Sequence, residues 1–421
     1  MNLLWLLLGP GNLRQGRWVL SLLGGVLLLF SMLIFLDSMG MVTELALEAF
    51  GYALVALGLF RSAFAVLGSG SGMTTRFGLQ GLVLILLGLG VADFPDTSDQ
   101  AVPWMIGIAF LLNGLYQTAS SLIIRYPRWG WFLASGLGHI GLATGLFLFS
   151  RQLMPLVLPV LLGGGLGILG ISALHLAHRL RGFPAGQGEL GPADRIRYYL
   201  AFHLPARFRR ADYPTPEPPL TLGTPHQDLL VYIWTPTDVA RLDHPDPNLM
   251  RYIVARDGEG KITVGHAALE LAPDVYVSHC DGDPGGYDNT DEAWRELRSK
   301  DGHGVFLPSF QEEIEHYLQP SVTLRFRNFH EDQLRTFWHL YRTVTTYNLT
   351  NRNCSVAVAL ALEAAVMGSL AGPSRPRALF RLLVNRDLWV AHFLRWKAME
   401  MVWTPGMMRD YALLLHRLVE N

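Results

Sequence analysis

The chain has 421 residues, a formal net charge of −1 and a hydrophobic fraction of 50%, with only 16% charged residues. This composition is too apolar for an ordinary soluble enzyme of this size, and it indicates that much of the chain lies in a membrane. The balanced charge gives no overall electrostatic signal for nucleic acid, so we expect no nucleic-acid partner. The two cysteines cannot form a disulfide framework, and they are compatible with a reducing compartment.

Hydrophobic runs about long enough to cross a bilayer fill the first part of the chain, residues 1–181. We predict a six-helix transmembrane bundle there, and its first helix is too long to be a cleaved signal peptide. The predicted spans are 18–36, 45–67, 77–95, 103–124, 129–149 and 154–177.

These six helices repeat as three copies of one hairpin. Segments that begin at Arg17, Arg76 and Arg128, spaced 59 and 52 residues apart, each open with arginine and an aromatic residue and continue into glycine-spaced leucines. Recurrent glycine, alanine and serine would let neighbouring backbones approach closely, as helices do in lipid. The pattern resembles the HdeD-like family of small bacterial acid-resistance membrane proteins, over roughly residues 15–180.

Charged residues at the ends of the spans predict the orientation of the chain. Arginines flank alternate ends, at Arg14, Arg17, Arg76, Arg125, Arg128, Arg179 and Arg181, with Arg151 as the exception. The opposite loops carry acidic residues, namely Asp37, Glu44, Asp93, Asp96 and Asp99. Because positively charged loops stay on the cytoplasmic side, both termini should face the cytoplasm of a multi-pass inner (plasma) membrane protein.

Three further segments follow the membrane domain. Residues 182–225 predict a basic and proline-rich juxtamembrane linker, whose arginines are either solvated or gain about 1 kcal/mol each from anionic membrane lipids. Residues 226–372 mix β-rich runs with helical patterns, which predicts an α+β domain. Residues 373–421 are too charged to span a bilayer and predict amphipathic helices that pack on this domain or lie in the membrane interface.

Two histidines lie in the predicted hairpin TVGHAALELAPDVYVSHC. If the turn is centred between Ala272 and Pro273, His266 and His279 face each other directly across the strands. Cys280 would then point to the other face as a buried apolar side chain. A histidine pair could ligate a metal ion, but a zinc site would need both cysteines in one cluster, so we predict no metal and no cofactor.

The other cysteine, Cys354, lies where the apolar helix of YNLTNRNCSVAVALALEAA begins. Asn351 or Asn353 can cap this helix, which puts Cys354 in the first turn, where the helix dipole favours a thiolate. A nearby histidine would accept the thiol proton, and a second polar residue would orient the imidazole. The alternative is structural, because a cysteine can simply pack in a core and a strand histidine can be satisfied locally.

The order of histidine, second histidine in the paired strand and Asn-Cys-Ser helix start resembles the circularly permuted papain-like fold. Its best-known members are the lecithin:retinol acyltransferase-like enzymes and permuted relatives of the NlpC-type peptidases, and the resemblance covers roughly residues 228–370. It implies that Cys354 is the nucleophile, His266 the general base and His279 the orienting polar residue. The stretch YNLTNRNCS also resembles the cysteine motif of the Lnb-type lipoprotein N-acyltransferases.

These features together predict a membrane-anchored thiol hydrolase or acyltransferase that works through a thioester at Cys354. The juxtamembrane tether favours a lipid, lipopeptide or amide substrate at the membrane surface, where its effective concentration is high. Two alternatives stay open. One is a cysteine peptidase or amidase that acts on soluble peptides, and the other is a non-catalytic stress-response membrane protein.

Overall fold

The computed structural model describes the chain in segments. They are residues 3–4, 6–9, 17–36, scattered positions between 45 and 91, 101–123, 129–179, 181, 191–202, 227–236, 255–256, 262–263, 265–282, 301–316, 319–370, 382, 385–400 and 402–420. The chain divides into two compact units, described separately below. One unit comprises residues 16–119 and 130–183, and the other comprises residues 1–15, 120–129 and 184–421.

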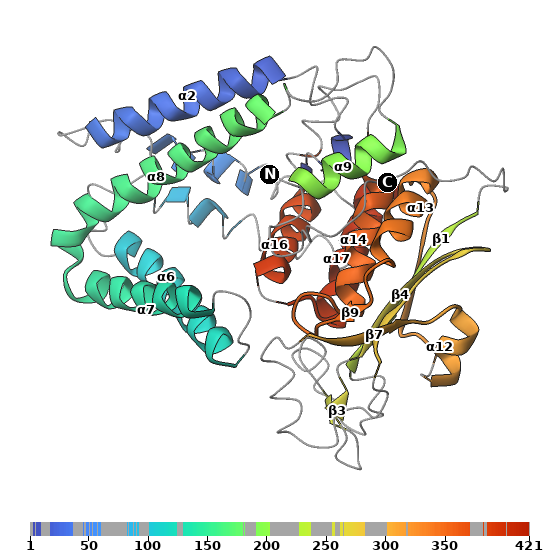
Figure 1. Cartoon of the computed structure of the whole chain (residues 1–421). Helices are drawn as coiled ribbons and strands as arrows, with labels where there is room; N and C mark the ends of the chain where they lie inside the picture. The colour runs from blue at the N-terminus through green and yellow to red at the C-terminus, as the bar shows by residue number, and fades with distance from the viewer. Residues whose placement is uncertain are drawn as a thin grey trace. The chain divides into compact units, whose positions relative to one another are not determined.

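The first unit is helical and confirms a membrane domain (Figure 1). Four of its helices are long and apolar enough to cross a bilayer, namely α2 (Arg17–Leu36), α6 (Ala101–Ile123), α7 (Trp129–Leu148) and α8 (Ser150–Arg179). They coincide with four of the predicted spans. The other two predicted spans, 45–67 and 77–95, lie mostly outside the described residues.

Glycines bring α2 and α8 into close contact. A β-carbon at Gly24 would lie 3.0 Å from the carbonyl oxygen of Gly170, and a β-carbon at Gly170 would lie 2.9 Å from that of Gly24. The Ser31 hydroxyl donates to the Gly163 carbonyl oxygen at 2.7 Å. Such backbone contact is how helices associate where lipid gives them no hydrophobic reason to do so.

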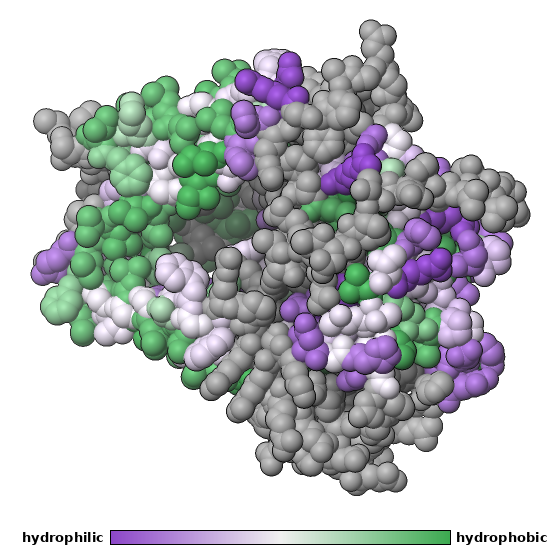
Figure 2. Space-filling view, in the orientation of Figure 1, coloured by the Kyte–Doolittle hydropathy of each residue, from purple (hydrophilic) through white to green (hydrophobic). Residues whose placement is uncertain are grey.

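The outer surface of these helices is apolar. Large side chains such as Leu22, Leu29 and Ile168 are exposed, and Figure 2 shows hydrophobic residues gathered over this unit. A surface of this kind is matched to acyl chains rather than to water.

The second unit is built on a four-stranded antiparallel sheet in the order β5-β4-β1-β8. Its strands are β1 (Leu229–Trp234), β4 (His266–Leu271), β5 (Val275–Val277) and β8 (Val322–Phe326). Helices α14 (Cys354–Val366) and α17 (Pro405–Glu420) pack on the sheet, with α12 (Phe310–His316) on its other side (Figure 1). Both faces are therefore covered, which explains why β1 is apolar throughout rather than alternating.

A second, three-stranded sheet continues from the first. It consists of β6 (His279–Asp281), β7 (Gly302–Phe306) and β9 (Thr346–Tyr347), with β7 in the middle. A separate two-stranded ribbon joins β2 (Ala255–Arg256) to β3 (Ile262–Thr263). Because β6 follows β5 with only Ser278 between them, the chain passes from one sheet to the other at that residue.

The hairpin between β4 and β5 differs from the prediction by one residue. Leu269 pairs with Val277, so the turn has three residues and is centred on Pro273. The prediction placed its centre between Ala272 and Pro273. A shift of one residue moves every side chain of the second strand to the opposite face.

This register separates the two histidines. Continued along the strands, the observed pairing sets Cys280 opposite His266 and turns His279 to the other side of the sheet. The prediction that the two histidines face each other is therefore wrong. The expectation that Cys280 points away from His266 is wrong for the same reason.

The C-terminal helices partly cover the second unit. Helix α17 packs on the sheet and on α14, and α16 (Arg386–Glu400) packs on α17. Helix α16 keeps an exposed aromatic side formed by Trp389, Phe393 and Trp396, which are spaced four and three residues apart. One predicted amphipathic helix thus packs on the domain, while the other presents apolar side chains outward.

A buried ion pair links four helices of this unit. Glu363 of α14 accepts from Arg395 of α16 at 2.7 and 2.8 Å. It also accepts from the hydroxyls of Tyr411 in α17 and Tyr199 in α9 (Pro192–Phe202), each at 2.9 Å. All four carboxylate contacts are charge-assisted or buried, so Glu363 is well satisfied despite its complete burial.

The N-terminal residues belong to the same unit. The carbonyl oxygens of Leu6 and Leu7 accept from the amides of Gly368 and Leu370, just beyond α14, at 2.9 and 3.1 Å. Gly368 has a φ of +82°, and a β-carbon on Gly9 would come within 2.8 Å of its α-carbon. The start of the chain is therefore held against the end of α14 by contacts that require glycine.

Candidate thiol site

Cys354 is the first residue of α14, and Asn353 is its N-cap. The Asn353 side-chain oxygen accepts from the Val356 amide at 2.8 Å, while its side-chain nitrogen donates to the carbonyl oxygens of Leu349 and Trp403, both at 2.8 Å. This confirms that the helix begins at Cys354 and selects Asn353 rather than Asn351 as the cap. Cys354 itself is 6% exposed.

The loop before Cys354 is held by its own polar side chains. The Asn348 side-chain oxygen accepts from the amide and the hydroxyl of Thr350, at 3.0 and 2.8 Å, and its nitrogen donates to Asp301 at 2.8 Å. Arg352 donates to the carbonyl oxygens of Tyr341 and Val344 at 3.0 and 2.6 Å. Asn348 and Arg352 therefore hold the loop before the cysteine, and both are buried, as is the cap Asn353.

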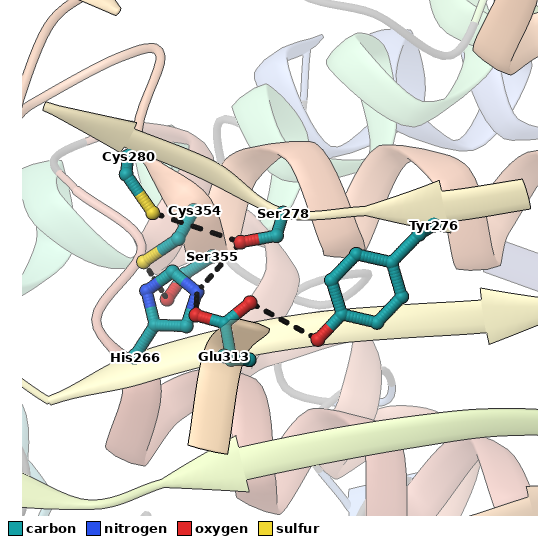
Figure 3. A network of polar contacts seen from close by, with 7 residues as sticks. All are labelled: His266, Tyr276, Ser278, Cys280, Glu313, Cys354 and Ser355. Carbon is teal, nitrogen blue, oxygen red and sulfur yellow. Dashed lines mark hydrogen bonds and ion pairs between the residues drawn. The ribbon is translucent and has the colours of Figure 1, made fainter. Parts of the chain in front are cut away.

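His266 opens β4, and its imidazole lies beside the Cys354 side chain (Figure 3). Gly265 directly precedes His266 and has a φ of +75°. The centroid of the Trp234 ring lies 5.7 Å from that of the His266 imidazole. In Figure 3 one ring nitrogen faces Cys354, while the other, Nε2, points away from it toward Glu313. The structure thus brings together two of the three predicted site residues.

The residue behind His266 is Glu313, which comes from α12. Its Oε1 lies 2.9 Å from His266 Nε2, and the hydroxyl of Ser278 lies 3.0 Å from the same nitrogen. The Tyr276 hydroxyl donates to the other carboxylate oxygen of Glu313 at 3.0 Å. Cys354, His266 and Glu313 therefore form a continuous line, with Glu313 in the place expected for His279 (Figure 3).

Electrostatics within this line favour charge separation. Burial alone would raise the pKa of Cys354, but the His266 charge and hydrogen bonds from His266, the Ala267 amide and Ser355 lower it below its ordinary value. Burial alone would lower the pKa of His266, yet the charges of Cys354 and Glu313 raise it. The arrangement therefore stabilises a thiolate beside an imidazolium.

Glu313 stays ionised in this setting. Burial would raise its pKa, but the His266 charge, together with hydrogen bonds from His266, Ser278 and Tyr276, holds it below its usual range. A carboxylate at Nε2 fixes the ring orientation and stabilises the protonated imidazole. Glu313 is thus suited to the orienting role.

His279 lies outside this line, in an aromatic pocket. Its Nδ1 is 3.2 Å from the Tyr341 hydroxyl, and the rings of Phe306 and Tyr347 lie 4.5 and 5.4 Å from its own. Burial and then the Arg352 charge lower the pKa of His279 to about 3, so it is neutral at physiological pH. The structure does not bring His279 to the Cys354 site, because the hairpin register turns it away.

Cys280 lies beside the site instead of away from it. Its sulfur is 3.6 Å from the Ser278 hydroxyl, which also contacts His266 (Figure 3). Burial and the Glu313 charge raise the pKa of Cys280, although the His266 charge opposes them. The pKa values of the two cysteines are therefore shifted in opposite directions, which favours a thiol at Cys280 and a thiolate at Cys354.

The sequence prediction missed Glu313, Ser278 and Tyr276. One signal could have identified Glu313, which stands three residues after Phe310 on the side of α12 that faces the core. A glutamate on the apolar side of a short helix is unusual unless it has a buried partner. Ser278 and Tyr276 depend on the hairpin register and gave no separate signal.

The arrangement can perform nucleophilic chemistry at a carbonyl group. Cys354 supplies a thiolate, His266 can give and take a proton, and the first amides of α14 can donate to an oxyanion. His266, Cys280 and Glu313 also place three potential metal ligands within 4.8 Å of one another. Both possibilities share His266.

Residues 79–150 match a family described as a short repeat of unknown function, DUF308. The matched residues lie within the part predicted as the membrane domain and include α6 and α7. The match and the apolar helices together support a membrane protein with a short-repeat domain. No curated protein and no solved structure matches the chain.

Proposed function

We propose that this chain is a membrane-anchored thiol hydrolase or acyltransferase that works through Cys354, His266 and Glu313. The observation that carries the proposal is the Glu313-His266-Cys354 line, in which Glu313 Oε1 lies 2.9 Å from His266 Nε2 and the other ring nitrogen faces Cys354 (Figure 3). A structural cysteine in an apolar core has no need for an ion-pair partner on a strand and a buried carboxylate behind it.

In the proposed first half-reaction, the Cys354 thiolate attacks a carbonyl carbon. The amides at the start of α14 stabilise the negative charge that develops on the carbonyl oxygen. His266 then gives its proton to the leaving alcohol or amine, so the substrate splits into a product and a thioester on Cys354. Glu313 holds the imidazole in place and stabilises its protonated form.

In the second half-reaction, water or an acceptor amine or hydroxyl attacks the thioester. Neutral His266 takes the proton of the attacking group, and the Cys354 thiolate leaves as the acyl group departs. Hydrolysis and acyl transfer use the same residues and differ only in the nucleophile that enters.

A lipid, lipopeptide or amide at the membrane surface is the proposed substrate class. Two observations support it: the domain is part of a chain with four candidate membrane-spanning helices, and α16 exposes Trp389, Phe393 and Trp396. Aromatic side chains of this kind favour the interface between water and lipid. A soluble peptide substrate would require neither membrane-spanning helices nor exposed aromatic side chains on α16.

We also propose that the domain has the circularly permuted papain-like fold, with resemblance to the Lnb-type acyltransferases, and that six helices cross the membrane. The histidine strand β4 precedes the cysteine helix α14 along the chain, which supports the permuted order. Scattered helical positions between residues 45 and 91 support two further spans. The arginine pattern supports termini in the cytoplasm.

The test is labelling of the full chain, in native membranes treated with a chelator, by a thiol-reactive acyl-mimicking probe. Cys354 should react faster than Cys280, and His266→Ala should slow it by about tenfold or more, because a thiolate without its imidazolium partner is less populated. Glu313→Gln should also slow labelling. Glu315→Gln is the matched control, since it is exposed on the same helix.

The proposal fails if the probe labels Cys354 no faster than Cys280 and if His266→Ala changes nothing. That result would favour a non-catalytic stress-response membrane protein. If labelling behaves as expected but only soluble peptides, and no lipid-linked acyl donors, compete with the probe, the peptidase or amidase alternative replaces the membrane substrate.

A further inference from the structure

Three side chains of different chemistry meet behind the thiol site. One ligating atom each from His266, Cys280 and Glu313 lies within 4.8 Å of the other two. Figure 3 shows the Cys280 sulfur and the Glu313 carboxylate on either side of the His266 and Ser278 contact. The Ser278 hydroxyl, 3.0 Å from His266 Nε2 and 3.6 Å from the Cys280 sulfur, is a fourth polar atom in the same place.

Each ligand is positioned by the fold rather than by a mobile side chain. His266 begins β4, Cys280 is the middle residue of β6, and Glu313 lies in α12 with its second oxygen held by Tyr276. His266 and Glu313 are 3% and 0% exposed, whereas Cys280 is partly exposed. Two of the three side chains are thus buried, and Cys280 is the one that is partly exposed.

The donor set selects a class of metal ion. Zinc binds thiolate sulfur, imidazole nitrogen and carboxylate oxygen in tetrahedral geometry, with ligand atoms at about 2.0–2.3 Å. Calcium and magnesium prefer oxygen ligands throughout, so they do not suit a site with one sulfur and one nitrogen. Three protein ligands leave a fourth position, which the Ser278 hydroxyl or a water molecule can fill.

We propose that His266, Cys280 and Glu313 form a binding site for a thiophilic divalent cation such as Zn²⁺. Binding releases two protons to solvent, one from the Cys280 thiol and one from Nε2 of the His266 imidazolium, so that the sulfur and the Nε2 lone pair can both ligate. The cluster must adjust modestly, because ligands of a tetrahedral zinc ion lie roughly 3.5 Å apart. The His266 Nε2 to Glu313 Oε1 contact of 2.9 Å must open, and the Cys280 sulfur must approach the other two ligand atoms. All three ligands can bind while they stay in the strands and the helix that carry them.

One consequence rests on the proposed function. A histidine that ligates metal through Nε2 carries its single proton on Nδ1, on the side of Cys354, and has no lone pair left to accept another. It can therefore no longer act as a general base, and the Nε2 contact with Glu313 is replaced by the metal. Zinc binding and thiol catalysis would exclude each other.

The test is metal binding by the full chain in detergent or nanodiscs. After removal of bound metal with a chelator, the protein is equilibrated with Zn²⁺ and the retained ion is measured by mass spectrometry. Wild type should retain one ion per chain, and Cys280→Ser and Glu313→Gln should lose it. Cys354→Ser and Glu315→Gln should keep it, because neither residue belongs to the proposed ligand set.

Cobalt gives a second measurement, whose wild-type signal does not depend on how any variant folds. Co²⁺ bound to wild type should show the charge-transfer absorption of a single thiolate, and Cys354→Ser should preserve it. If Cys354→Ser abolishes this absorption while Cys280→Ser keeps it, the metal is bound by the nucleophile and the proposal is overturned. Absence of retained zinc in wild type would overturn it as well.

Failure of the metal site and failure of the proposed function give different results. Slow labelling of Cys354 in metal-free protein that still binds zinc through Cys280 would reject the thiol chemistry and leave the metal site standing. Fast labelling of Cys354 in a protein that retains no zinc would do the reverse. If both hold, added Zn²⁺ should suppress turnover of an acyl substrate in wild type.

Discussion

At the scale of single residues, Cys354 and His266 depend on each other for their charge. Both are buried, and burial disfavours the thiolate and the imidazolium alike. Each ion is stable because the other is present, with Glu313 supplying a second negative charge on the far side of the ring. A change at one group should therefore appear in the titration of the other.

This mutual dependence predicts the pH profile of alkylation in chelator-treated protein. The pKa of Cys354 is lowered, so its thiolate should persist as the pH falls from about 8.5, the ordinary value for cysteine, until the pH passes through the lowered pKa. The pKa of Cys280 is raised, so its labelling should disappear first. His266→Ala should move the Cys354 profile to higher pH, as measured by mass spectrometry of the labelled peptides.

His279 provides the comparison for that profile. Its imidazole is neutral and lies in the aromatic pocket with Tyr341, so His279→Gln should leave the midpoint of the Cys354 profile in place even if it lowers stability. Equal movement of the Cys354 midpoint in His266→Ala and His279→Gln would contradict the assignment of Glu313 rather than His279 to the orienting position.

The sequence was sufficient to predict that Cys354 and His266 come together, but not which residue lies behind His266. Helix capping and an apolar run place Cys354 at a helix start, and these are local features. The third position depended on whether the hairpin turn has two or three residues, and Pro273 is compatible with both. Glu313 lies in α12, which is far along the chain from both His266 and Cys354, so its place in the site depends on tertiary packing.

At the scale of elements, the start of α14 is fixed by one side chain. Asn353 makes three hydrogen bonds, one to Val356 of the helix and two to carbonyl oxygens outside it. Asn353→Ala should lower the free energy of unfolding by about 1–3 kcal/mol, because a cap is lost and buried carbonyl groups remain. It should also slow labelling of Cys354, whose backbone position it sets.

Ser309, which caps α12, is the matched control for this prediction. Its hydroxyl accepts from the Glu312 amide at 3.3 Å at the exposed start of α12. Ser309→Ala should cost less than Asn353→Ala in thermal unfolding of the detergent-solubilised chain. Equal losses would mean that the two additional hydrogen bonds of Asn353 contribute little.

Breaking the buried Glu363-Arg395 pair should lower the free energy of unfolding by more than removing either helix cap. Glu363→Gln leaves the Arg395 charge buried without its carboxylate, and the loss in free energy of unfolding should be about 3–5 kcal/mol. Replacing both together, Glu363→Leu with Arg395→Met, should be less harmful than the single change. Asp228→Asn, which removes exposed contacts with Arg325 and Arg327, is the control and should cost at most about 1 kcal/mol.

The membrane helices were the most predictable elements. Their length and hydropathy follow from bilayer thickness, and the four described spans begin and end within a few residues of the prediction. Glycines such as Gly24 and Gly170 marked the contact faces because lipid-embedded helices need small residues to approach. The short strands β5 and β6 were harder, because alternation over three residues does not fix a register.

At the scale of the whole molecule, the N-terminal residues and the C-terminal domain belong to one unit. Since the carbonyl oxygens of Leu6 and Leu7 accept from the amides of Gly368 and Leu370, we expect both segments to lie on the same side of the membrane. The chain between them is then expected to cross the bilayer an even number of times. Reporters fused at residues 1 and 421 should report the same side, and opposite sides would contradict the packing of the N-terminal segment.

The same reporters also decide which side that is. The arginine pattern predicts the cytoplasm. A result that places both ends outside would overturn this orientation while keeping the even number of crossings. It would also strengthen the resemblance to the Lnb-type acyltransferases, which act on the outer face.

The contact between Leu6 and Gly368 also bears on the order of synthesis. Leu3, Leu6 and Leu7 are translated long before the surface that buries them, which is complete only when the chain through Leu370 has been made. The unit that contains Cys354 thus reaches its final form after translation has passed residue 370. In a recombinant fragment that starts at residue 184, the surface that packs against Leu3, Leu6 and Leu7 would be exposed to water. Adding residues 1–15 as a separate peptide should therefore improve the solubility of the fragment.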